Sequence, residues 1–299
     1  MEFWIIASVA AACFQTVRFM LQKQLATGAL SAAGATYARF VYSAPLLLLG
    51  LSLYFASSHA ELPPLSARFW MFAAIGGIAQ IIATIATVMM FQERNFAVGV
   101  TLTKTEVLIT VLTGFLILGD RVSLIGIAAI FLGLFGVILL SAKNDAALAF
   151  RNLSRRAATL ALIAGVLFSI SAVTYRGAAL EVEVEQAMLR GAITLAAATS
   201  IQTLIMSLWL RLRERGEIAR VFSAWRTAGL IGIFSLCGSW GWFTAFSLQN
   251  AAYVKALGQI EVVLSLAASA LFFREAITRR EVIGIGFMTA SILGLIIFH

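Results

Sequence analysis

The chain contains two related stretches of sequence. Residues 91–123 read FQERNFAVGVTLTKTEVLITVLTGFLILGDRVS, and residues 246–278 read FSLQNAAYVKALGQIEVVLSLAASALFFREAIT. At an offset of 155 residues the two stretches align without a gap and share seven identities in 33 positions. Asparagine and glutamate are scarce in this apolar sequence, yet one of each recurs in register, and the glutamates are Glu106 and Glu261. The alignment therefore predicts an internal duplication.

The segments that follow the two stretches repeat as well. Residues 120–123 and 275–278 each contain an acid, an aliphatic residue and a hydroxyl residue suited to cap the next helix. Thr278 with Glu281 predicts a capping box. Small residues then recur at a spacing that allows close helix packing: Gly126, Gly133 and Gly136 in the first half, and Gly284, Ser291 and Gly294 in the second.

The composition excludes a water-soluble fold. The chain is 61% hydrophobic and 12% charged, with a mean hydropathy of +0.95, whereas soluble domains are roughly 25% charged. Apolar runs of about 20 residues, the length needed to cross a bilayer, recur along the chain. We predict membrane spans at residues 3–22, 35–56, 69–91, 96–118, 122–142, 157–178, 187–210, 227–248, 251–273 and 280–298.

The duplication and the spans together predict the domain organisation. We expect an all-α integral membrane protein of ten transmembrane helices, with a first repeat at residues 1–145, a cytoplasmic linker at 146–156 and a second repeat at 157–299. Because each repeat has an odd number of helices, the second repeat enters the membrane in the opposite sense. Inverted repeats of this kind recur in secondary transporters, whose sites lie near the midplane between the repeats.

The net charge of +8 is distributed unevenly between the two membrane faces. With the termini outside, we assign sixteen basic residues to cytoplasmic joints: Arg18, Lys23, Arg39, Arg94, Lys143, Arg151, Arg155, Arg156, Arg211, Arg213, Arg215, Arg220, Arg226, Arg274, Arg279 and Arg280. Four lie in the opposite joints: Arg68, Arg121, Arg176 and Arg190. Lys104 and Lys255 fall inside the membrane. This positive-inside bias predicts that both termini are periplasmic, and it accounts for the basic charge without a nucleic acid partner.

The duplicated pattern resembles the EamA-type members of the drug/metabolite transporter superfamily. The resemblance covers essentially the whole chain and consists of an ordered set that occurs twice. The set comprises Arg39, Glu106-Val107, the acidic joint and Gly126 in the first half, and Arg190, Glu261-Val262, the acidic joint and Gly284 in the second. Within the family the sequence looks most like the YddG-type exporters of aromatic amino acids. The resemblance implies an exporter in the bacterial inner membrane.

Polar residues on the third helix of each half are candidates for a substrate cavity. Gln80, Thr84 and Thr87 share one face of the first of these helices, and Ser239 and Trp242 lie on its counterpart in the second half. A polar stripe is costly against lipid, so it faces another helix or an aqueous cavity. The alternative is that the hydroxyls bond back to their own helix backbone.

Glu106 and Glu261 are candidates for coupling or gating, because each lies about eleven residues into its helix and ionisable groups at the midplane usually have a function. Interhelical packing is the alternative reading. We expect Lys104 to keep Glu106 ionised, whereas Glu261 lacks a cation and is neutral when buried. Lys104, Lys255 and Gln259 are candidates to bind the charged groups of an amino acid. Lys255 snorkelling to the membrane surface is the alternative.

Aromatic residues are candidates to contact an apolar side chain of the substrate, and Phe168 and Tyr175 join Trp242 as the main ones. The wider set also includes Phe14, Trp240, Phe243 and Phe246. Aromatic residues are common at lipid-facing positions, which is the alternative.

Motifs for catalysis or nucleotide binding are absent from the sequence, and its two histidines lie in a loop and at the last position. We therefore predict no enzyme activity, no cofactor and no metal. The expected function is secondary export of small amphipathic metabolites, above all amino acids with aromatic or large neutral side chains, by alternating access. A proton-coupled multidrug exporter and a membrane scaffold are the alternatives. The expected partners are a small-molecule substrate and the lipid bilayer, with monomer and oligomer both open.

Overall fold

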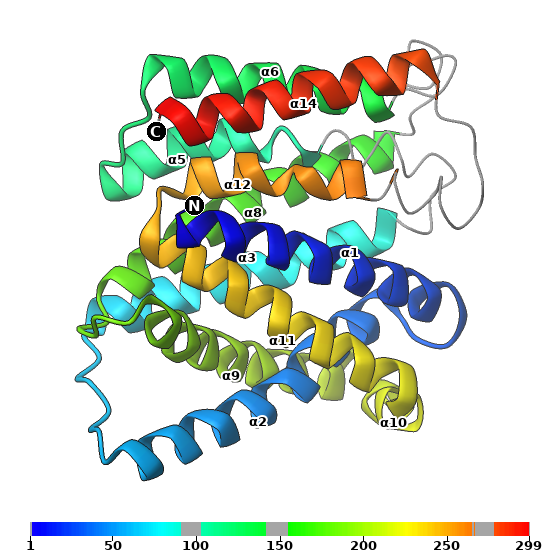
Figure 1. Ribbon diagram of the computed structural model, residues 1–299. Coiled ribbons are helices and arrows are strands. Elements are labelled where there is room, and N and C mark those ends of the chain that lie inside the picture. Colours follow the sequence, from blue (N-terminus) through cyan, green and yellow to red (C-terminus); the bar gives the residue numbers. More distant parts are fainter. Residues whose placement is uncertain (1, 91–102, 142–154, 265, 267–277, 299) are drawn as a thin grey trace.

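The computed structural model describes residues 2–90, 103–141, 155–264, 266 and 278–298, and in these ranges the regular structure is helical (Figure 1). The helices of the first half are α1 (Phe3–Gly28), α2 (Ala32–Ser58), α3 (Ala67–Met90), α5 (Glu106–Leu118) and α6 (Leu124–Ser141). Those of the second half are α8 (Arg155–Leu180), α9 (Ala187–Arg213), the short α10 (Glu217–Ser223), α11 (Trp225–Leu248), α12 (Ala251–Gly258) and α14 (Arg279–Phe298).

The described helices include seven that are long and apolar enough to cross a membrane, namely α1, α2, α3, α8, α9, α11 and α14. Two shorter apolar helices, α5 and α6, lie at further predicted spans. The remaining predicted span, at 251–273, is represented by α12 and by helical residues 260–264, and residues 265 and 267–273 of it lie outside the described residues. The prediction of an all-helical membrane protein is therefore confirmed.

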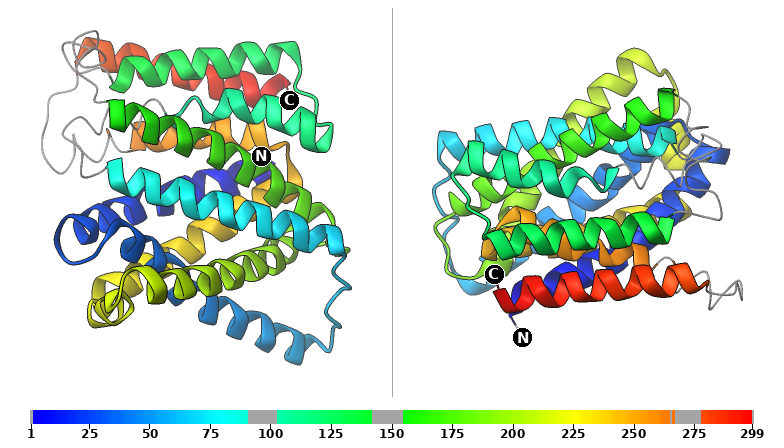
Figure 2. Two further views of the ribbon diagram at one scale, coloured as in Figure 1. Left: turned by 180° about the vertical axis from the view of Figure 1, so that it is seen from behind. Right: turned by 90° about the horizontal axis from the view of Figure 1, so that it is seen from above.

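The long helices run beside one another between two ends of the molecule, as the three views in Figures 1 and 2 show. Both termini lie toward the same end, and α10 lies at the other. The main helix pairs are α3 with α8, α1 with α11, and α6 with α14. In the first two pairs, the third long helix of one half packs against the first helix of the other half. The two halves therefore share one packed interior.

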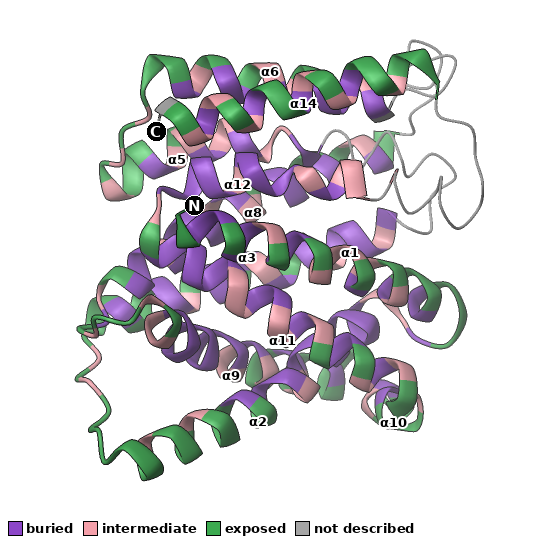
Figure 3. Cartoon of the chain, in the orientation of Figure 1, coloured by how far each residue is buried: buried purple, intermediate pink, exposed green. Residues whose placement is uncertain are grey.

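Buried residues gather where the helices of the two halves meet, and Figure 3 shows them in purple at the centre of the molecule. The largest buried cluster draws residues from α1, α5, α8, α11 and α12. In contrast, the second part of α2 carries exposed apolar side chains such as Leu48, Leu49 and Leu53. In a bilayer such side chains face lipid without the cost that water would impose.

The predicted helix cap and the predicted close packing are both present. The Thr278 backbone N–H donates to Glu281 Oε2 at 2.7 Å, and the Glu281 N–H donates to Thr278 Oγ1 at 3.3 Å, which is a capping box. At the contact between α6 and α14, a Cβ on Gly136 would come 2.9 Å from the carbonyl oxygen of Gly284. These two helices therefore approach closely because neither has a side chain there.

A turn occurs at equivalent positions of the two halves, which the sequence did not predict. In the first half Lys104 and Thr105 form a turn before α5 begins, and in the second half Gln259 forms a turn after α12. The Val107 N–H donates to Lys104 O at 3.3 Å, and the Val262 N–H donates to Gln259 O at 2.9 Å. Both bonds join residues three apart, as in a 3₁₀ turn, whereas an α-helix joins residues four apart. The two turns lie 155 residues apart in the sequence.

Candidate functional site

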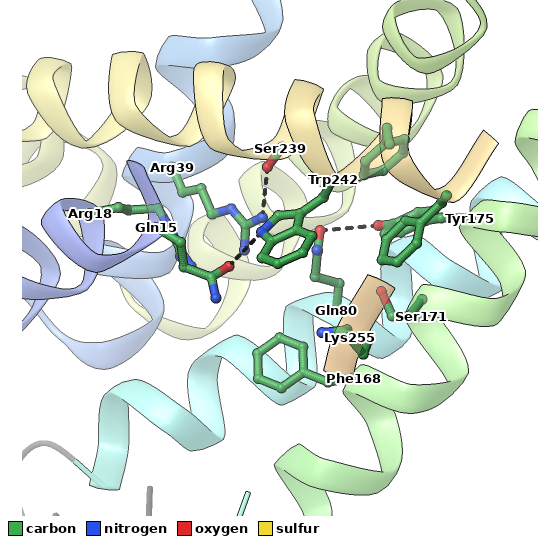
Figure 4. A pocket seen from close by; sticks show the side chains of 13 residues that line it. Gln15, Arg18, Arg39, Gln80, Phe168, Ser171, Tyr175, Ser239, Trp242 and Lys255 are labelled. Carbon is green, nitrogen blue, oxygen red and sulfur yellow. Dashed lines mark hydrogen bonds between the residues drawn. The ribbon is translucent and has the colours of Figure 1, made fainter. Parts of the chain in front are cut away.

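A pocket between the two halves is lined by polar and aromatic side chains (Figure 4). The space between these side chains, counted together with the solvent at the open mouth of the pocket, is about 410 Å³. The first half supplies Gln15 and Arg18 from α1, Arg39 from α2 and Gln80 from α3. The second half supplies Phe168, Ser171, Ala172 and Tyr175 from α8, Ser239, Trp242, Phe243 and Phe246 from α11, and Lys255 from α12.

The aromatic part of the pocket comes from α8 and α11. The rings of Tyr175 and Phe243 have centroids 4.3 Å apart, and those of Trp242 and Phe246 stack at 6.3 Å. Trp242 packs closely against Gly258 of α12, where a Cβ would overlap the indole ring. The aromatic residues hence form a fixed apolar wall inside the pocket.

A glutamine network supports the side of the pocket formed by α3 and α8. The Tyr175 hydroxyl donates to Gln80 Oε1 at 3.1 Å, and Gln202 Nε2 of α9 donates to the same oxygen at 2.9 Å. Gln202 Nε2 also lies 3.1 Å from the Tyr175 hydroxyl and 3.2 Å from the Gly77 carbonyl oxygen. These hydrogen bonds join Gln80, Tyr175 and Gln202 without a charged group, and Gln202 Oε1 has no hydrogen-bond partner among the described residues.

Arg18 and Arg39 lie inside the helices and line the pocket, so their assignment to cytoplasmic joints was wrong. Only 3% of Arg18 and 5% of Arg39 is exposed. Arg18 Nη1 donates to Gln22 Oε1 at 2.8 Å. Arg39 donates to Ser239 Oγ at 3.0 Å and to Thr84 Oγ1 at 3.4 Å. Each arginine lies four residues inside the predicted end of its span, at residue 22 or residue 35, and was counted with the adjacent joint. The helices extend beyond both predicted ends, since α1 continues to Gly28 and α2 begins at Ala32.

Two ion pairs join the fourth helices of the two halves crosswise. Lys104 of the first half pairs with Glu261 of the second, and Lys255 of the second pairs with Glu106 of the first, with 3.2 Å between Lys255 Nζ and Glu106 Oε1. All four side chains are mostly buried. Each carboxylate therefore has a cation from the opposite half of the chain.

This pairing contradicts the expectation that Lys104 accompanies Glu106 while Glu261 has no cation. Residues two apart in a helix point to different faces, so Lys104 does not lie beside Glu106 along a regular helix. The turn at residues 104–105 gives Lys104 a separate direction, toward Glu261. The sequence could not reveal the crossed pairing, since it depends on how the two halves face each other.

Gln15 connects the aromatic wall to one of the ion pairs. The indole N–H of Trp242 donates to Gln15 Oε1 at 3.1 Å, and Gln15 Nε2 donates to Glu261 Oε2 at 2.7 Å. Lys255 makes the corresponding link for the other pair, because its Nζ lies 5.4 Å from the centre of the Phe168 ring and 5.9 Å from that of Trp242. Trp242 is hence in contact with Gln15, which binds Glu261, and lies near Lys255, so a movement of Trp242 would change the surroundings of both ion pairs.

The structure brings together six of the ten predicted cavity residues: Gln80, Phe168, Tyr175, Ser239, Trp242 and Lys255. The other four lie outside this lining. Thr84 accepts from Arg39, Thr87 donates to the Ala83 carbonyl oxygen at 2.9 Å, Lys104 pairs with Glu261, and Gln259 is buried at the turn after α12. Binding of a substrate by any of the ten stays a prediction.

The wider aromatic set divides in the same way. Phe243 and Phe246 line the pocket, whereas Phe14 packs against Phe234 with ring centroids 6.0 Å apart. Trp240 donates to the Met188 carbonyl oxygen at 2.8 Å, away from the lining.

Four polar lining residues were missed as site candidates: Gln15, Arg18, Arg39 and Ser171. The sequence contained one signal for them, since Arg18 lies on the same face as Gln15 and Gln22, three and four residues away. Polar residues at that spacing within an apolar helix indicate an inward face.

Comparisons with known proteins agree with this architecture. The model of the EamA-like transporter family matches residues 155–297. A solved crystal structure shares 15% identity with a TM-score of 0.71, over 97% of this chain and 95% of its own, and at that identity the likeness shows the fold alone. No curated protein matches the sequence. The C-terminal part of this membrane protein, residues 155–297, is therefore similar to the EamA-like transporter family.

Proposed function

We propose that this protein is a secondary transporter that exports small amphipathic metabolites across the bacterial inner membrane, with aromatic and large neutral amino acids as its substrates. The observation that carries the proposal is the pocket, which joins an aromatic wall to polar and charged side chains among membrane-spanning helices. Polar groups are costly within a bilayer and mark a path for polar solutes. The family match of the C-terminal half supports a transporter over an enzyme or a scaffold.

The proposal includes ten spans arranged as two inverted repeats. The helix pairs support it: α3 packs on α8 and α11 packs on α1, which is the exchange of partners that a two-fold relation between the halves requires. The equivalent helices α6 and α14 pack on each other, as do α5 and α12. The matched turns at Lys104 and Gln259 support it further.

Alternating access follows from this arrangement, because the two repeats can rock about a site that both of them line. The crossed ion pairs, Lys104 with Glu261 and Lys255 with Glu106, hold the halves together beside the pocket. We assign Glu106 and Glu261 a gating role, in which these contacts separate as the pocket opens to one face. The 3₁₀ turns next to both glutamates are suitable places for the helices to bend.

Uptake by liposomes that contain the purified protein tests this function. Labelled phenylalanine should enter in a saturable manner that tyrosine and leucine inhibit, and protein-free liposomes should show leakage alone. Imposed proton and potential gradients in separate samples distinguish coupled from facilitated transport and thereby test the proton-coupled multidrug alternative. A protein that moves none of these solutes in any gradient would contradict the proposal and favour a scaffold.

A further inference from the structure

We propose that the pocket binds the carboxylate of its ligand between Arg18 and Arg39 and does not bind the ammonium group, so that aromatic carboxylic acids are better ligands than the corresponding zwitterionic amino acids. The proposal rests on the proposed function, because it assigns a ligand class to the same pocket. It starts from the partners of the two arginines.

Both guanidinium groups are buried and have neutral partners only. Each guanidinium has five N–H donors, and the described hydrogen-bond partners are the side chains of Gln22, Thr84 and Ser239. Arg18 also lies over the Phe19 ring and Arg39 over the Phe40 ring, and both rings are uncharged. Within the ranges that the structure describes, no carboxylate forms an ion pair with Arg18 or Arg39. Lys104, Lys255 and Arg176, by contrast, each pair with a carboxylate. The arginines at the pocket thus differ from these cations.

Two like charges facing one cavity without a counter-ion are unfavourable, since burial removes the water that would otherwise screen them. An anionic ligand removes this cost and uses the free donors, and arginine suits a carboxylate because its planar fork matches the two oxygens. Arg18 and Arg39 come from adjacent helices, and Figure 4 shows both on the side of the pocket away from Tyr175. The carboxylate would hence lie at the arginines and the apolar part against Trp242.

The rest of the lining offers little to an ammonium group. The described lining residues contain three cations, Arg18, Arg39 and Lys255, and no aspartate or glutamate. The side-chain oxygens of Gln15 and Gln80 already accept hydrogen bonds from Trp242, Tyr175 and Gln202. A net anion therefore suits this pocket better than a zwitterion, and a zwitterion better than a cation.

Binding of four related compounds to the purified full chain in detergent tests the ligand class. The compounds are 3-phenylpropionate, phenylalanine, phenylalaninamide and phenethylamine, which share the ring and differ in the charged groups. We expect 3-phenylpropionate to bind most tightly, phenylalanine next, and the two compounds without a carboxylate at least about tenfold more weakly than 3-phenylpropionate, a factor that corresponds to roughly 1.4 kcal/mol. Equal binding of phenethylamine, tighter binding of phenylalanine, or no binding by any carboxylate would overturn the proposal.

Variants of the arginines test the location. Arg18→Gln and Arg39→Gln should each weaken 3-phenylpropionate binding at least about tenfold, and Arg39→Lys should lie between Arg39→Gln and the wild type because it keeps the charge without the fork. The control is Arg68→Gln, since Arg68 is exposed and lies outside the pocket. Without ligand, the glutamine variants should melt no lower than the wild type, because each removes an uncompensated charge. Unchanged binding in both variants would overturn the proposal, as would melting at a clearly lower temperature with binding retained.

Uptake by liposomes separates this inference from the proposed function. If carboxylates bind through Arg18 and Arg39 but do not cross the membrane, the proposed anion site would be supported and the proposed transport function would be contradicted. If the uptake of phenylalanine is saturable and is unchanged in both arginine variants, the proposed transport function would be supported and the proposed anion site would be contradicted.

Discussion

Trp242 is placed to decide which apolar groups fit the pocket. Its ring stacks on Phe246, its N–H is held by Gln15, and its edge packs against Gly258. Trp242 is 9% exposed, and it lines the pocket. A side chain fixed on three sides offers a ligand a rigid apolar surface at little entropic cost.

Replacing Trp242 by alanine should therefore weaken the binding of aromatic solutes more than that of small ones. We expect a loss of roughly 1–3 kcal/mol in apparent affinity for phenylalanine and a much smaller loss for alanine. The measurement is inhibition of uptake by each solute in liposomes with matched amounts of protein. Trp225→Ala is the control, because Trp225 also belongs to α11 but is 61% exposed. Similar losses for phenylalanine and alanine would show that Trp242 supports the fold and not the ligand.

At the scale of the helix, the crossed ion pairs join two segments that have a turn at the same repeat position. Each pair takes one side chain from the segment around α5 and one from the segment around α12. Because both partners are mostly buried, removing one member leaves an uncompensated charge, whereas removing both leaves none.

We expect Lys255→Met to destabilise the protein by about 3–5 kcal/mol and the double variant Lys255→Met/Glu106→Gln to be destabilised less. Melting temperatures in detergent would check this order. Arg68→Met is the control for an exposed pair, that of Arg68 with Glu181, and should cost about 0–1 kcal/mol. A double variant that melts below the single variant would show that Lys255 and Glu106 do not stabilise each other.

The helices were largely predictable from the sequence, and the site only in part. Apolar runs mark the spans, and local rules gave the capping box at Thr278 because its groups lie within three residues of each other. A charge near the end of an apolar run can belong to a loop or to an inward helix face, and hydropathy does not distinguish the two. Arg18 and Arg39 were misplaced for that reason, and the partners of Glu106 and Glu261 depend on contacts between distant segments.

At the scale of the whole molecule, the sequence predicts that the two ends differ in charge. Without Arg18 and Arg39, fourteen of the sixteen basic residues first assigned to the cytoplasmic face remain there in the sequence, against four on the other face. The structure places both termini toward one end and α10, with Arg220 and the nearby Arg213, at the other. The positive-inside rule therefore still predicts periplasmic termini.

Alkaline phosphatase fused after residue 299 should be active, because this enzyme folds to its active form in the periplasm. A fluorescent protein fused at the same place should be dark, because it becomes fluorescent in the cytoplasm and not after export in an unfolded state. Fusions to chains cut after Gly216, between α9 and α10, are the control and should give the opposite pattern. Reversal of both patterns would invert the orientation without changing the fold. The same pattern at both positions would contradict the placement of these segments at opposite ends.

The two buried arginines without a carboxylate partner also bear on the rate of the transport cycle. If the pocket must close around them before it can reopen on the other face, closure without a ligand retains two uncompensated charges, whereas closure around an anion does not. The empty carrier should then return more slowly than the loaded one. Exchange of internal for external substrate would be faster than net efflux, and efflux of labelled 3-phenylpropionate from liposomes should speed up when unlabelled compound is added outside. An efflux rate that does not respond to external compound would show that the empty pocket closes as readily as the filled one.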